Sequence, residues 1–396
     1  MRTFTCTKSR RHDPSQKGKI MAMEISLDEN GKISPDSELF KQLDEWHDKD
    51  EYRKIVEAVL SVPHENWSNK LWFRLISAYN NMKEFDKARE ELDKIAPFCD
   101  NPADIAKLRY MRGYIYYRED REYLAIAEYR CGLEADPDNT ARLNLENEIE
   151  DCRKYIRKNL AKLRSLSEKL YNDIKVRCRE KSEKNKLSDE EFTLYLGFLP
   201  ALRVIPGHEH SIGFDYSGKY ESAEKQALLD WLKTGFGITD RESFFDFYYN
   251  APHCNINSMG EEVRMYLAGT PLFDMDQLNS DGRYAFECFT EFIKTFNEFL
   301  PDAGVLAWDI SEGMGFVRWA YACDIITDAD FSEQMRFLHD LAREYFTSFE
   351  DYILSLAFGA AFFMFKLDKL NLISSIDYLA RTAPLLLHGD LPDLEW

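Results

Sequence analysis

The sequence lacks paired cysteines, long apolar runs and any excess of positive charge. Its eight cysteines are scattered over 396 residues without a C-x-x-C pair, which excludes a disulfide framework and a typical structural zinc site. The longest apolar run, residues 352–365, is shorter than the roughly 20 residues of a membrane-spanning helix, so we expect a buried helix there. Scattered cysteines and the incomplete signal sequence in residues 1–20 predict a cytoplasmic protein.

Glycine and proline are scarce, and the common catalytic motifs are missing. With 18 Gly, 13 Pro and 44% hydrophobic residues, the chain is neither collagen-like nor globally disordered. No G-x-S-x-G, P-loop or G-x-G-x-x-G sequence occurs, which argues against classical hydrolases and nucleotide-binding enzymes. We therefore expect a binding protein more than an enzyme, and we predict no cofactor.

Charge is distributed unevenly along the chain. The 51 Lys and Arg stand against 70 Asp and Glu, and the net charge of −19 opposes a general role on nucleic acids or anionic membranes. The net charge changes from −7 over residues 1–152 to +9 over 153–186 and −21 over 187–396. These shifts, with the repeats below, predict four segments: a disordered extension (1–35), a repeat domain (36–152), a basic linking helix (153–186) and an acidic domain (187–396).

Two segments upstream of the basic region, 71–95 and 108–133, align with each other. The small residues Ala88 and Ala125 occupy matching positions, and a degenerate earlier copy, offset by 33 residues, extends the array toward residue 36. Small residues let two helices approach closely, so each copy reads as a helix pair. The period resembles that of tetratricopeptide repeats, which implies a solenoid of helical hairpins with a concave binding face.

The resemblance to tetratricopeptide repeats also indicates which side chains face the groove. Lysine, arginine and amide groups mixed with aromatic rings can hold an extended peptide or its terminal carboxylate. An ordinary solvated face with a few packed tyrosines is the equal alternative. The candidate groove residues are Lys70, Phe73, Asn80, Asn81, Lys107, Tyr110, Tyr114, Tyr117 and Arg118.

The basic segment 153–186 has apolar residues at helical spacing, including Ile156, Leu163 and Leu170, so it predicts a long amphipathic helix. Because it contains only two aromatic residues, we expect it to pair with the acidic surface of the C-terminal domain rather than with nucleic acid. Ser188 and Glu191 have the spacing of a capping box that starts the next helix.

The acidic domain shows helical periodicity in most segments, so the whole chain is predicted to be all-α. Thr327 and Ser348 precede acidic and apolar residues in the manner of N-caps. The expected helices are 189–199, 221–234, 240–250, 258–268, 283–300, 306–322, 328–346 and 348–366.

Three pieces of this domain, 231–242, 307–321 and 345–359, resemble the bacterial family known as domain of unknown function 1266. They carry, in order, a G-I-T-x-R-E turn, a W-D pair followed by R-W-x-Y, and an aromatic-rich helix after a serine. The sequence departs from the family at Glu312 and Ala360, where relatives usually have Arg, and at Phe349, where they have Trp. The resemblance implies a bacterial origin and a shared fold, without an established reaction.

Polar and aromatic residues in these pieces form a candidate C-terminal site: Trp231, Arg241, Trp308, Asp309, Arg318 and Trp319. A buried polar network that fixes helix register is the favoured interpretation, and a ligand or catalytic site is the alternative. His208 and His210, with His253 and Cys254, lack the closing spacing of a metal site, so we predict none.

Taken together, these patterns predict a bacterial cytoplasmic adaptor that binds a peptide or protein through the repeat groove. One alternative is a small-ligand or enzymatic C-terminal domain, for example a toxin- or stress-related one. Another is an acidic inhibitor that covers a basic partner with the −21 surface. The partner's identity and the oligomeric state stay open.

Overall fold

The computed structural model describes residues 26–179, 186–189, 222–250, 256–272, 274–388 and 395–396. Over these residues the fold is all-α, as predicted, and the only β-type pairing is an isolated bridge between Leu27 and Ile33. The predicted helix 189–199 and the histidine cluster at 208–210 lie outside the described residues, except for Asp189. Backbone contacts divide the chain into two compact units. The first comprises residues 1–119 and 124–152, and the second comprises 120–123 and 153–396.

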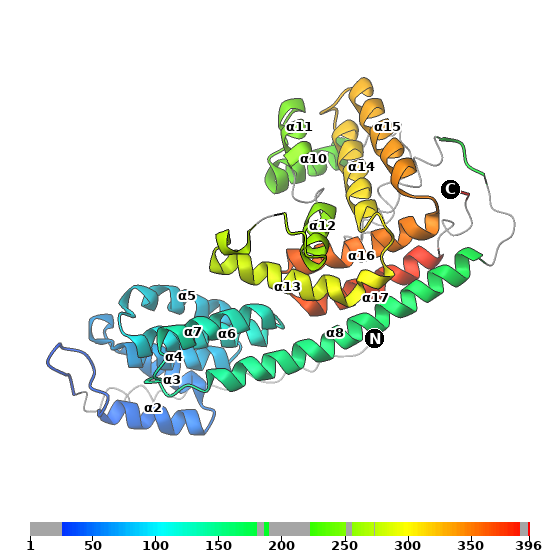
Figure 1. Ribbon diagram of the computed structural model, residues 1–396. Helices are drawn as coiled ribbons and strands as arrows, with labels where there is room; N and C mark the ends of the chain where they lie inside the picture. Colours follow the sequence, from blue (N-terminus) through cyan, green and yellow to red (C-terminus); the bar gives the residue numbers. More distant parts are fainter. Residues whose placement is uncertain (1–25, 180–185, 190–221, 251–255, 273, 389–394) are drawn as a thin grey trace, which may run out of the picture. The chain divides into compact units, whose positions relative to one another are not determined.

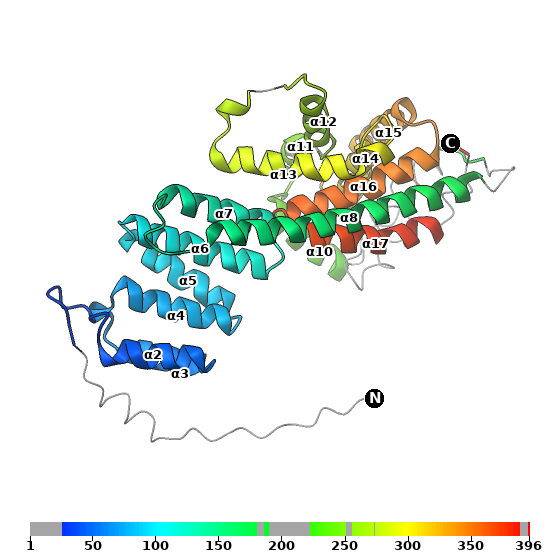
Figure 2. The ribbon, with the colours of Figure 1, turned by 60° about the horizontal axis from the view of Figure 1, so that its bottom comes forward.

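The first unit consists of short helices, each of which packs on its neighbours in sequence (Figures 1 and 2). Helix α3 contacts α2 and α4, and α4 contacts α5 and α6. Their bounds are α2 (Glu38–Asp48), α3 (Tyr52–Ser61), α4 (Asn69–Asn81), α5 (Phe85–Ile95), α6 (Pro102–Arg118) and α7 (Glu122–Ala135), with single turns η1 (His64–Asn66) and η2 (Ala96–Phe98).

Local sequence explains where these helices start and why they approach closely. The side chains of Ser68 and Asn101 cap α4 and α6 by accepting hydrogen bonds from backbone amides three residues later. Ala88 and Ala125 are fully buried, in agreement with the small positions of the repeat pattern. A Cβ added at Gly113 would lie 2.4 Å from the Tyr129 ring, so only glycine allows the observed contact between α6 and α7.

Residues 26–35 differ from the predicted disordered extension. Ile33 is completely buried in the core of the first unit, and its amide donates a 2.9 Å hydrogen bond to the carbonyl of Asn66. The side chain of Asn66 in turn donates to the carbonyl of Gly31 at 2.7 Å. A single apolar side chain among polar residues was too little signal to predict this anchored segment.

The second unit contains longer and more apolar helices. Helix α8 (Leu145–Arg179) starts in the first unit and continues into the second from Arg153 onward. It begins eight residues earlier than the predicted linking helix. The other elements are α10 (Ser222–Phe236), α11 (Arg241–Asn250), α12 (Ile256–Leu267), η5 (Met275–Gln277), α13 (Ser280–Phe296), η6 (Asn297–Phe299), α14 (Leu306–Ala322), α15 (Asp328–Tyr345), α16 (Phe349–Leu367) and α17 (Leu372–His388).

Helices α14 and α16 form the centre of the second unit, where both are buried on almost every side. The predicted N-caps of α15 and α16, Thr327 and Ser348, both accept the expected backbone hydrogen bonds. A Cβ added at Gly359 would lie 2.4 Å from Cβ of Trp308, so these helices touch almost backbone to backbone. Within the described residues no single helix has the length and apolarity of a membrane span, although α15 and α16, bent by 108°, meet that test as a pair.

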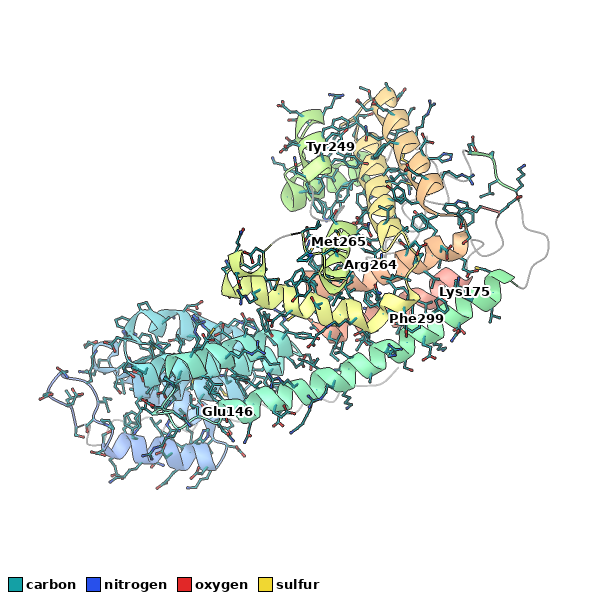
Figure 3. The ribbon with its side chains drawn as sticks, in the orientation of Figure 1. Glu146, Lys175, Tyr249, Arg264, Met265 and Phe299 are labelled. Carbon is teal, nitrogen blue, oxygen red and sulfur yellow. The ribbon has the colours of Figure 1, made fainter. Side chains whose placement is uncertain are left out.

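The part of α8 in the second unit pairs with acidic side chains of that unit. Arg164 forms an ion pair with Glu298, and Lys175 forms one with Glu350. The ring centroids of Tyr171 and Phe299 are 5.7 Å apart. Figure 3 labels Lys175 on α8 and Phe299 on η6. The basic helix therefore pairs with acidic groups of the C-terminal region, as the charge distribution predicts.

Candidate functional site

In the series α2, α4 and α6, the second and third helices each carry a lysine that lies against an aromatic ring of the helix before it. The ammonium of Lys70 on α4 lies 4.6 Å from the centroid of the Phe40 ring on α2. The ammonium of Lys107 on α6 repeats this arrangement at 5.0 Å from Phe73 on α4. Such contacts contribute about 0.5–1 kcal/mol at exposed sites and more where water is excluded. We call this surface, with Arg74 on α4, the α2–α4–α6 face.

The electrostatics of the α2–α4–α6 face favour an anion. Burial lowers the pKa of Lys107, and the nearby positive charges of Arg74 and Lys70 lower it further, against the opposing effect of Asp104. Asp44 forms an ion pair with Arg74 and offsets part of the positive charge. A negative group placed between these three cations would restore the ordinary pKa of Lys107, because an opposite charge favours the protonated amine.

The other predicted groove residues divide into buried and accessible groups. Phe73 and Asn80 are only 2% and 3% exposed, although the repeat pattern placed them in the groove. The reason is that α4 contacts α2, α3, α5 and α6 and is therefore buried on most sides. The buried Phe73 ring thus packs under the ammonium of Lys107 instead of contacting a ligand directly.

The remaining groove candidates lie on α4 and α6. Asn81 is half-buried at the end of α4. Arg118 is exposed and donates a 2.7 Å hydrogen bond to the hydroxyl of Tyr114. Tyr110 packs against the Tyr129 ring with the centroids 6.0 Å apart, and Tyr117 is half-buried. Among these residues, Arg118 and Tyr114 form one accessible pair. Asn81, Tyr110 and Tyr117 contribute mainly to packing.

In the second unit, Asp309 holds the start of another helix. Its two carboxylate oxygens accept hydrogen bonds from the backbone amides of Ile256 (3.0 Å) and Asn257 (2.9 Å) at the N-terminus of α12. In return, the side-chain oxygen of Asn257 accepts a 2.9 Å hydrogen bond from the amide of Val305, which precedes α14. A carboxylate at a helix N-terminus satisfies amides that lack intrahelical partners and favours the helix dipole. Asp309 therefore acts as the acceptor for the first amides of α12.

The tryptophans of the candidate site occupy two different places. Trp231 on α10 and Trp319 on α14 pack edge to face with ring centroids 5.1 Å apart, beside Phe236 and Phe316. Trp308, eleven residues before Trp319 on α14, lies about 16 Å away along the helix axis. It is buried against Gly359 and the Phe363 ring. The structure brings Trp231 and Trp319 together and places Trp308 elsewhere.

Arg241, the first residue of α11, makes its contacts in a third place, at the start of α15. Its guanidinium donates two hydrogen bonds to the carboxylate of Asp330, at 2.7 and 3.0 Å. The same carboxylate accepts from the amide and hydroxyl of Thr327, which completes the capping box of α15. These donors, the Arg241 guanidinium foremost, hold the pKa of Asp330 well below its usual range. The neighbouring Asp240 accepts hydrogen bonds from the amide and hydroxyl of Ser243.

Sequence reasoning did not identify Asp330 as the partner of Arg241. The available signal was the T-x-x-D spacing of Thr327 and Asp330, which marks a capping box but does not indicate which cation comes to it. Arg318 and Glu312 lie on α14, where Arg318 is half-buried and Glu312 is buried. The six candidate residues therefore serve at least three separate contacts rather than one site.

No cluster of three or more potential metal ligands exists within the residues described above. His208, His210, His253 and Cys254 lie outside them. The three positions at which the sequence departs from the family pattern, Glu312, Phe349 and Ala360, are all buried. The Phe349 ring packs on Trp396 with the centroids 4.9 Å apart, so it fills its position as an aromatic core residue.

Comparisons with known proteins bear on the C-terminal domain. No curated protein and no solved structure matches the chain. No tetratricopeptide-repeat family matches the first unit. Residues 220–396 match the family described as "Protein of unknown function (DUF1266)", which supports the resemblance of the C-terminal domain to that family.

Proposed function

We propose that this protein is a bacterial cytoplasmic adaptor whose N-terminal, tetratricopeptide-like helical array binds a protein or peptide partner. The observation that carries the proposal is the α2–α4–α6 face, on which Lys70, Arg74 and Lys107 gather around two aromatic rings. Cations in a partly desolvated, aromatic setting recognise carboxylates more strongly than exposed cations do.

The partner that fits this face is an extended peptide with acidic side chains or a free terminal carboxylate. Lys107 is the key group, because its amine is desolvated and lies near two other positive charges. Binding of an anion removes that repulsion and stabilises the charged amine, so the protein contributes a preorganised cationic pocket. Arg118, on the last turn of α6, extends the positive surface for the rest of the peptide.

The test compares two lysine variants with similar local contacts. Lys107→Met removes a cation from the α2–α4–α6 face, whereas Lys87→Met removes one on α5 that lies 5.6 Å from the ring of Tyr79 on α4. The tagged full-length protein is used for pull-down from its host and for binding to arrays of acidic peptides with free or amidated termini. Loss of the same partner in Lys107→Met, with retention in Lys87→Met, supports the proposal.

Two outcomes would contradict the proposal. In one, Lys107→Met and the double variant Lys70→Met with Lys107→Met retain every partner at wild-type level. In the other, neither the host extract nor the peptide arrays contain anything that binds the wild-type protein. Equal binding of free and amidated peptides would assign recognition to acidic side chains instead of the terminal carboxylate.

A further inference from the structure

Glu122 is a buried carboxyl group that makes no compensating hydrogen bond. It begins α7, its exposed fraction is 0%, and neither carboxyl oxygen has a hydrogen-bond partner. An ionised carboxylate in such a place is costly, whereas a neutral carboxyl costs much less. Buried polar groups in folded proteins nearly always have partners, so this arrangement calls for a specific explanation.

The segment that contains Glu122, residues 120–123, is attached to helices of the second unit by its other side chains. Asp120 accepts a 3.1 Å hydrogen bond from the hydroxyl of Tyr155 on α8. Tyr123 donates a 3.4 Å hydrogen bond to Glu291 on α13 and packs edge to face on Phe365 of α16, with ring centroids 5.8 Å apart. We call these four residues the 120–123 segment.

Charged and titratable groups around Glu122 do not favour its ionisation. Desolvation is the largest effect and raises the pKa of Glu122 to about 7, and the negative charge of Asp120 adds to it. The backbone amide of Glu122 itself acts in the opposite direction, although its geometry falls short of a hydrogen bond. Tyr155 on α8 and Glu291 on α13 are neutral or negative, and Glu119 on the preceding turn forms an ion pair with Arg89. Within the part of the chain that the structure describes, no positive charge counteracts the desolvation of this carboxyl group.

Two buried donors nearby also lack acceptors. These are the Nε of Arg121, which precedes Glu122 in the chain, and the Nδ2 of Asn159, one turn after Tyr155 on α8. An ionised Glu122 needs such donors or water, and its oxygens have none in the present arrangement, so ionisation favours a shift of the 120–123 segment. The present arrangement of the segment therefore suits a neutral carboxyl. The unpartnered donors of Arg121 and Asn159 are available for a second arrangement with an ionised carboxylate.

We propose that Glu122 is a protonation switch: the neutral carboxyl holds the 120–123 segment against α8, α13 and α16, and ionisation releases it. The direction follows from linkage. Because the pKa is raised in the attached state, attachment is strongest below the ordinary pKa of glutamate, weakens as the pH rises toward about 7, and stays constant above that.

Trypsin cleavage after Arg121 in the full-length protein measures release, since the Arg121–Glu122 bond is cleaved only when the segment opens. Rates are normalised to a peptide of residues 116–128 at each pH. With pKa values of 4.5 and about 7 for the free and attached states, the normalised rate rises about 20-fold from pH 5.5 to 7.5 and less than about twofold from 7.5 to 8.5. Glu122→Gln, a neutral isostere, gives a low rate without this dependence.

Glu128→Gln is the matched control, since Glu128 lies on the same helix and pairs with Arg109; it keeps the wild-type pH profile. A wild-type rate that does not change with pH, or an unchanged pH profile in Glu122→Gln, overturns the proposal. If Glu122→Gln does not fold, carbon-13 NMR of labelled glutamate in the wild-type protein decides by direct titration. A Glu122 pKa between 4 and 5 in that experiment also overturns it.

Discussion

The two units of this protein use aromatic side chains in different ways. In the first unit, Phe40 and Phe73 lie directly beneath surface lysines, so that aromatic and charged groups together form the α2–α4–α6 face. In the second unit, rings from α13 and α16 stack on one another inside the core, as Phe292 and Phe365 do with centroids 4.5 Å apart. The first arrangement forms the surface that we propose binds a partner, whereas the second packs the core around α14 and α16.

This difference makes the units unequal in their response to a change in packing. Each helix of the first unit contacts mainly its neighbours, so a local defect can be absorbed locally. The second unit depends on the close crossing of α14 and α16, where Trp308 and Gly359 touch. The following predictions test that inequality, starting with the largest expected effect.

Substitution of Gly359 by Ala should destabilise the second unit most. The new Cβ would lie 2.4 Å from Cβ of Trp308, so two helices must separate, at a cost of about 1–3 kcal/mol or more. Thermal unfolding followed by circular dichroism should show a melting temperature at least about 4 °C lower. Gly235→Ala on α10, where a Cβ meets nothing within 4 Å, is the control and should not lower it. Equal melting temperatures for the two variants would contradict the crossing as described.

Gly113→Ala in the first unit should have a smaller effect. Its Cβ would meet ring atoms of Tyr129, which lie further from the backbone of α7 than Cβ of Trp308 lies from the backbone of α14, so less of the neighbouring helix has to move. We expect a loss of about 1–2 kcal/mol in the unfolding of the first unit. Hydrogen exchange measured separately for both units should show the change in α6 and α7 alone. A loss of protection as large as that in Gly359→Ala would remove the difference between the units.

Asp309→Ala tests whether the second unit also depends on polar contacts between helices. Loss of the carboxylate leaves the amides of Ile256 and Asn257 without their acceptor, which should cost about 1–2 kcal/mol. Urea unfolding should show a lower midpoint, while Asp328→Asn, at an exposed position in the first turn of α15, should leave it unchanged. An unchanged midpoint in Asp309→Ala, with a ligand-dependent activity lost, would instead favour a functional site at Asp309.

Asp330 should make the stability of the second unit depend on pH in the acid range. Its pKa is lowered in the folded state, chiefly by Arg241, so this contribution is complete above the ordinary pKa of aspartate and is lost below it, as the pH falls toward the lowered pKa of the folded state. The melting temperature of Asp330→Asn should lie below that of the wild type at pH 7, and the difference should start to narrow as the pH falls below about 4 toward pH 3. A difference that stays constant from pH 7 to pH 3 would show that the charge of Asp330 is not involved.

Much of the second unit could be predicted from sequence because local capping residues mark where its helices begin. The N-caps Thr327 and Ser348 and the apolar spacing between them placed α15 and α16 within one residue of their observed bounds. Helix α17 was missed, since it includes Pro384, which normally argues against a continuing helix. Asn371 was the available signal: its side chain accepts from the amides of Ile373 and Ser374.

The candidate sites were harder to predict, because they depend on contacts between helices distant in sequence. The acceptor role of Asp309 requires the start of α12, more than 50 residues earlier, to arrive beside α14. Similarly, the pattern of Lys107 and Phe73 gave their helix positions but not that one side chain covers the other. Spacing within a helix is encoded locally, whereas the partner across a helix crossing is set by the packing of the whole unit.

The reciprocal hydrogen bonds between α12 and α14 have a consequence for how the second unit opens. Asp309 of α14 holds the first amides of α12, and Asn257 of α12 holds the amide of Val305 before α14. Neither helix start can fray while the other stays intact, so the two should behave as one cooperative opening unit. Amide protons of Ile256, Asn257 and Val305 should then exchange with solvent at a shared opening free energy, although they come from chain segments 48 residues apart.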